Sequence, residues 1–79
     1  MNWRNYIETD DNVLVGKPVV KGTRLSVEHI IKLFASGWSE QQILENYPRL
    51  TKESLQAVFS YIQDMMKDGL FYDEPLKTA

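Results

Sequence analysis

The sequence predicts a mainly α fold, a three-helix helix-turn-helix bundle preceded by a small β-hairpin arm. Helical hydrophobic periodicity runs through residues 26–66 and is broken only at Ser36–Trp38 and Tyr47–Leu50. Both breaks are short, so consecutive helices must turn sharply against each other, as in a helix-turn-helix unit. The preceding residues alternate β-branched side chains with glycine and proline turn signals, which favours short strands.

The chain is expected to form one domain, residues 1–79. It has a β arm at 1–25, a helical core at 26–66 and a C-terminal tail at 67–79. With 79 residues, 43% of them hydrophobic, it is near the lower size at which one core suffices. It contains no cysteine, and it has no membrane-length apolar run or signal peptide. We therefore expect a cytoplasmic protein with no cofactor.

The β arm is expected to form one or two short hairpins. Tyr6–Glu8 favours a short strand, which the following Asp-Asp-Asn sequence ends as a turn. Pro18 and Gly22 mark further turns, and we expect Trp3 to fold back onto the core. The side chains predicted to face inward are Val13, Val15, Val19 and Leu25. Because so small a ribbon is unstable alone, it must pack on the helices or on a second subunit.

Capping residues mark where the three predicted helices begin, and glycine or proline residues mark where they end. The N-caps are Ser26, Ser39 and Thr51, and Gln42 completes a capping box with Ser39. The terminators are Gly37, Pro48 and Gly69. The predicted core-facing residues are Val27, Ile30, Ile31, Phe34, Ile43, Leu44, Tyr47, Leu55, Val58, Phe59, Ile62 and Met65 or Met66.

The net charge of the chain does not favour nucleic-acid binding, but the charge of its N-terminal half does. The net charge is −2, but residues 1–36 carry a balance of +1 and residues 37–79 a balance of −3. The candidate DNA-binding residues are Lys17, Lys21, Arg24, Arg49, Lys52 and Gln56. Gln56 suits an adenine edge and Lys52 a phosphate, but Glu53 beside them repels phosphate. A dimer that brings two basic arms together would strengthen this hypothesis.

No pattern in the sequence predicts catalysis or a metal site. His29 is the only histidine, and the carboxylates are scattered or adjacent in predicted loops. The glycines lack the spacing of a phosphate-binding loop. We therefore expect no enzyme, and we name no catalytic and no metal-binding residue.

The tail offers a candidate site for a protein partner. Leu70, Phe71 and Tyr72 are consecutive and apolar, and Asp73 and Glu74 follow them. Such a segment suits an apolar groove on a partner, because aromatic side chains dominate interface energetics. The alternative is that these residues cover the exposed end of the chain's own core.

Several ordered motifs resemble one family. Residues 16–27 read GKPVVKGTRLSV, residues 37–39 read GWS, Ile43-Leu44 follows, and residues 47–51 read YPRLT. This pattern resembles the bacterial and archaeal "domain of unknown function 433" family, from about Ile7 to about Tyr61. The resemblance implies a homeodomain-like or winged-helix-like three-helix fold with a small β element. Some members are similar to antitoxins of the VapB type, encoded beside a PIN-like ribonuclease toxin.

The resemblance leads to three functional hypotheses. The first is an antitoxin-like, non-enzymatic protein that binds and neutralises a small ribonuclease toxin and represses its own operon. Its Leu70, Phe71 and Tyr72 would then anchor in the toxin. The second is a stand-alone DNA-binding regulator that recognises an operator, and the third is an interaction module with no DNA role. We expect a homodimer under all three.

Overall fold

A computed structural model describes residues 1–69 and confirms the predicted mainly α fold. The helices are α1 (Val27–Ala35), α2 (Glu40–Asn46) and α3 (Lys52–Lys67). The arm before them contains the short 3-10 helices η1 (Trp3–Asn5) and η2 (Leu14–Gly16) and the strands β1 (Ile7–Glu8) and β2 (Val19–Val20). The predicted partner-binding residues Leu70, Phe71 and Tyr72 lie outside the described residues.

The predicted caps form and fix where each helix begins. The Ser26 hydroxyl accepts a hydrogen bond from the His29 backbone N–H, with 2.9 Å between oxygen and nitrogen. Ser39 and Gln42 make the predicted capping box. Thr51 makes a second capping box with Ser54, which the sequence analysis did not anticipate. These bonds satisfy N–H groups that the first turn leaves without helical partners, so the helix boundaries follow the sequence closely.

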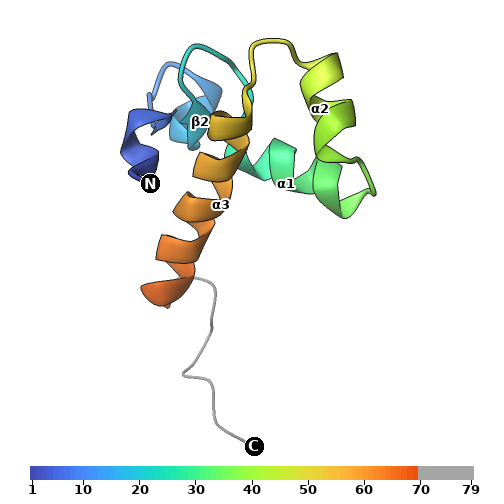
Figure 1. Cartoon of the computed structure of the whole chain (residues 1–79). Helices are drawn as coiled ribbons and strands as arrows, with labels where there is room; N and C mark the ends of the chain where they lie inside the picture. Colours follow the sequence, from blue (N-terminus) through green and yellow to red (C-terminus); the bar gives the residue numbers. More distant parts are fainter. Residues whose placement is uncertain (70–79) are drawn as a thin grey trace, which may run out of the picture.

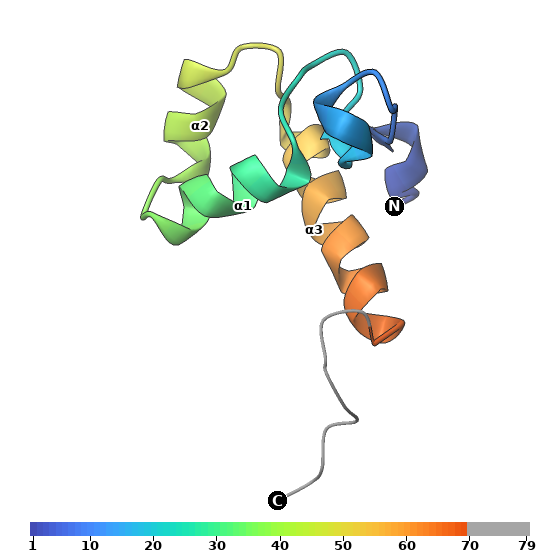
Figure 2. The same ribbon diagram turned by 180° about the vertical axis from the view of Figure 1, so that it is seen from behind.

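The arm is a two-stranded antiparallel sheet in which Ile7 pairs with Val20 and Glu8 with Val19. Strand β2 also bonds on its other side, where the Val20 N–H donates to the Leu25 carbonyl at 3.0 Å. The Val27 N–H in turn donates to the Pro18 carbonyl at 2.9 Å. The arm is therefore continuous with the start of α1, and its η1 and β1 pack against α3, as Figures 1 and 2 show.

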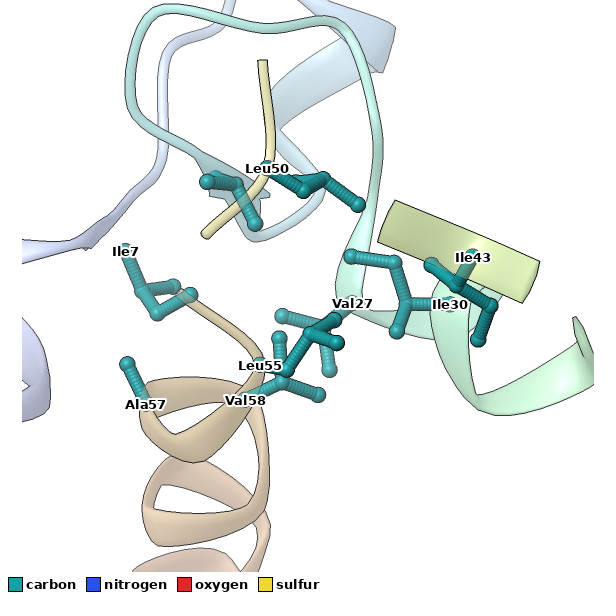
Figure 3. Close-up of a cluster of buried hydrophobic side chains, with 9 residues drawn as sticks. Ile7, Val27, Ile30, Ile43, Leu50, Leu55, Ala57 and Val58 are labelled. Atoms are coloured by element: carbon teal, nitrogen blue, oxygen red, sulfur yellow. The ribbon is translucent and has the colours of Figure 1, made fainter. Parts of the chain in front are cut away.

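The core lies where the arm and the three helices meet. Each helix contributes one large side chain with no exposed surface: Ile30 from α1, Ile43 from α2 and Val58 from α3. Figure 3 shows these side chains in one cluster with residues of the arm and of the α2–α3 connection. The remaining members are Ile7, Val20, Val27, Leu50, Leu55 and Ala57. One helix, α1, bridges the other two in both views (Figures 1 and 2).

Trp3 folds back onto the core, as predicted. Its indole N–H donates to the Asp64 carboxylate at 2.6 Å. Its ring also packs edge-on against Tyr61, with 4.8 Å between the ring centroids. These contacts join the first element of the chain to the C-terminal half of α3.

The prediction that Val15 faces inward is wrong, because its side chain is 92% exposed. The chain turns in the left-handed region at three consecutive residues, with φ of 49° at Leu14, 56° at Val15 and 77° at Gly16. This turn directs Val15 away from the core. A β-branched residue is unfavourable there, since the side chain then crowds the following carbonyl group.

The prediction that Phe59 belongs to the core is also wrong, because its side chain is 48% exposed. The apolar stripe of α3 is wider than the surface that the arm and α1 cover. Phe59 lies at the edge of that stripe and packs instead against the half-buried Phe34, with 5.2 Å between ring centroids. Met65 is half-buried and Met66 is exposed, so Met65 is the inward member of that pair.

Replacing Val15 with asparagine should stabilise the protein by about 1 kcal/mol, because asparagine tolerates the left-handed region. Val13 provides a matched control, since it is half-buried and has an extended φ of −123°. Val13→Asn should destabilise. The measurement is the free energy of unfolding in urea. A lower value for Val15→Asn than for the wild type would show that Val15 makes a stabilising contact in solution.

Candidate functional site

The turn at residues 21–24 is built rigidly. The Thr23 hydroxyl donates to the Val20 carbonyl at 2.7 Å and accepts from the Leu25 N–H at 3.0 Å. Gly22 has a φ of 77°, which glycine adopts without steric cost. The backbone geometry of the turn thus explains both Gly22 and Thr23.

A single side chain ties this turn to the connection between α2 and α3. The Arg49 guanidinium donates from Nη1 to the Gly22 carbonyl at 3.1 Å, across 27 positions in the sequence. Arg24 and Arg49 consequently line one hollow, together with Tyr47 and Pro48. Within residues 1–69, the exposed Arg24 side chain has no hydrogen-bonding or ion-pair partner. Its guanidinium is therefore open to an external anion.

Four of the six predicted DNA-binding residues lie on this part of the surface, which we call the basic edge: Lys17, Lys21, Arg24 and Arg49. Lys21 is exposed on the same turn as Arg24. Lys17 and Arg24 line a second hollow that also includes His29 and Lys32. Lys17 is partly neutralised, because its Nζ lies 3.5 Å from a carboxylate oxygen of Glu28. The pair is exposed, so it contributes little to stability.

Lys52 and Gln56, the other two predicted residues, stand apart from the basic edge. Lys52, the first residue of α3, lines a hollow with Glu40 and Glu45 of α2. Gln56 is exposed one turn further along α3. The carboxylates beside Lys52 and the adjacent Glu53 would repel a phosphate backbone. The basic edge therefore suits a polyanion better than the exposed face of α3 does.

His29 has a neighbour that the sequence analysis missed. Its Nε2 lies 3.3 Å from the Tyr47 hydroxyl, and the two rings meet edge-on with 6.1 Å between centroids. The residues are 18 positions apart, so no local pattern connects them. The pair joins α1 to the end of α2 on the exposed surface. Within the described part of the chain, no group of three histidine or carboxylate side chains is arranged to hold a metal ion.

The structure also reveals an apolar groove, whose residues Val27, Ile31 and Ile62 the sequence analysis predicted to face the core. Its floor consists of Pro18, Val27, Ile31, Tyr61 and Ile62, and Lys17 and Glu28 stand at its rim. Helical periodicity alone correctly puts Ile31 and Ile62 on inward faces. It could not show that no residue among 1–69 covers the angle between α1 and α3. Neither α1 nor any other helix formed by residues 1–69 is long and apolar enough to cross a membrane.

Comparisons with known proteins agree with this arrangement of a β arm and three helices. The family model "Protein of unknown function (DUF433)" matches residues 7–62. The chain therefore belongs to the DUF433 family, and the predicted resemblance is confirmed. The match includes the turn at 21–24 and the α2–α3 connection, and it ends within α3.

Two known proteins are similar to this chain. A crystal structure of a DUF433 member protein from Anabaena variabilis ATCC 29413 is similar, with a TM-score of 0.75 and 28% sequence identity. The similarity covers 82% of this chain and 64% of that one. The "Uncharacterized protein y4eO" of Sinorhizobium fredii (strain NBRC 101917 / NGR234) is 32% identical over 60 residues. That match spans 76% of this chain and 27% of the relative.

The two arginines of the basic edge should respond differently to substitution. Arg49→Met should lower the free energy of unfolding by about 1 kcal/mol, because the Gly22 carbonyl loses its donor. Arg24→Met removes the same charge but should change stability by less than about 0.5 kcal/mol. Urea unfolding of both variants makes the comparison. Equal effects would mean that the Arg49 bond does not hold the two turns together.

Proposed function

We propose that this chain is an antitoxin-like domain that binds and neutralises a small PIN-like ribonuclease toxin. The family description gives no activity, so the proposal depends on the chain's surfaces and on the resemblance to VapB-type antitoxins. In this role the chain performs no chemistry itself. It acts by covering the active site of the ribonuclease.

The supporting observation is the amount of apolar surface along α1 and α3. Phe59 is 48% exposed beside Phe34, and Met66, the penultimate residue of α3, is 44% exposed. The apolar groove adjoins Ile62, which precedes Met66 by four residues and so shares its side of the helix. Leu70, Phe71 and Tyr72 follow in the sequence, after Gly69. Exposed apolar side chains on one side of a helix, as at Phe59, Ile62 and Met66, are typical of a protein-binding site.

The operon-repressing part of the proposal depends on the basic edge. Arg24 and Arg49 line one hollow, and Lys21 is exposed on the turn that carries Arg24. This is the observation that favours the second candidate function, binding to an operator without a protein partner. One chain offers few phosphate contacts, so we propose a homodimer in the cytoplasm that presents two basic edges to DNA.

The toxin-binding role predicts that the double variant Phe71→Ala, Tyr72→Ala fails to inhibit the ribonuclease, because the apolar anchors are lost. The measurement is cleavage of an RNA substrate by the purified ribonuclease as antitoxin is added. Thr78→Ala, in the same tail, is the matched control and should inhibit like the wild type. Full inhibition by the double variant would exclude Phe71 and Tyr72 as the anchors.

The DNA-binding role predicts a shift of the promoter fragment upstream of the protein's own gene, with affinity that falls steeply as salt rises. Arg24→Met should reduce the slope of log affinity against log salt by about 1 per site, because one phosphate contact is lost. Lys67→Met, at the far end of α3, is the matched control. A salt-independent shift, or equal slopes for both variants, would refute the role of the basic edge.

A further inference from the structure

We propose that the apolar groove between α1 and α3 is a docking site for the chain's own tail, residues 70–75. The groove is lined mainly by carbon, with Pro18, Ile31 and Ile62 among its residues. A groove of this composition favours an apolar occupant over water. This inference concerns contacts within one chain and is tested without the proposed toxin. A toxin that takes Leu70, Phe71 and Tyr72 would have to displace them from the groove.

The path from the end of α3 to the groove is short. Gly69 follows α3 with a φ of 76°, a left-handed conformation that turns the chain away from the helix axis. Ile62 lies seven residues earlier on α3, and at 1.5 Å per residue this is about 10 Å along the axis. An extended chain covers that distance in about three residues. Residues 70–72 are therefore long enough to reach the groove, and Met66 provides an apolar surface along the way.

The composition of the tail suits that of the groove. Three apolar residues, Leu70, Phe71 and Tyr72, come first and suit the side chains of Ile62 and Ile31. Asp73 and Glu74 follow them. Strand β2 lies toward the end of α3 away from Gly69 (Figure 1), and Lys17, which precedes β2, lines the groove beside its ion-pair partner Glu28. A tail that runs back along α3 thus brings its acidic pair toward a lysine.

A cysteine-pair experiment tests this docking in the full-length chain, which contains no native cysteine. One cysteine replaces Pro75, beyond the apolar and acidic residues, and the other replaces Glu28, which is exposed at the groove rim. The matched control pairs the same Pro75→Cys with Gln63→Cys. Gln63 is exposed on α3 and is closer to Gly69 in sequence than any residue of the groove. A tail that samples all directions would therefore react with it at least as fast.

Docking predicts an intramolecular disulfide that forms at least about tenfold faster in the Glu28 pair than in the Gln63 pair, because the docked tail holds its cysteine at high local concentration. Adding Phe71→Ala should slow the Glu28 pair to the rate of the control. Non-reducing gels and mass spectrometry report the product, and circular dichroism confirms that each variant is folded.

Three results would overturn the proposal. Equal rates for the two pairs would mean that the tail does not prefer the groove. A disulfide-linked dimer from the Glu28 pair would assign the groove to the tail of a second copy. Absence of the Glu28 disulfide would show that the tail does not occupy the groove, which would then be a site for a different protein partner.

Discussion

The fold depends on the point where Ile30, Ile43 and Val58 meet, because each helix has one fully buried large side chain there. Removing several methyl groups from such a position costs about 2–5 kcal/mol, while small domains are stable by only about 5–15 kcal/mol in total. Since α1 bridges the other two helices, loss of this junction would also release the arm that packs beside it (Figure 1). The turns that carry the basic edge are thus positioned by a core only a few residues wide.

The sequence predicted the features that local chemistry determines. The capping serines, the terminating glycines and, apart from Phe59 and Met66, the helical stripes lie where their patterns placed them. The sequence did not predict the burial of side chains that depends on how the helices and the arm pack against each other. Val15 has the alternation expected of an inward residue, but a left-handed turn directs it to solvent. Ile62 belongs to the correct stripe, yet the groove beside it depends on the angle at which α1 crosses α3.

The candidate sites also combine features that the sequence predicted with features that only the structure shows. The sequence indicated a basic segment, but the contact between Arg49 and Gly22 depends on residues 27 positions apart. Arg49 is both a structural donor and a cation of the basic edge, whereas Arg24 is free of structural partners within the described residues. Binding of a ligand to these two arginines therefore has different effects on the fold. A ligand that takes the Arg49 guanidinium weakens a contact of the fold, and a ligand of Arg24 does not.

The bond between Trp3 and Asp64 has a consequence for how the protein is made. The two residues are separated by 61 positions, so almost the whole described chain must be synthesised before they can meet. Until α3 emerges from the ribosome, Ile7 in β1 lacks the helix against which that strand packs. Contacts of such long separation form slowly, because a large loop must close first. We therefore expect the domain to complete its folding only after α3 is released, so the nascent arm is the stage at which chaperones have apolar residues to bind.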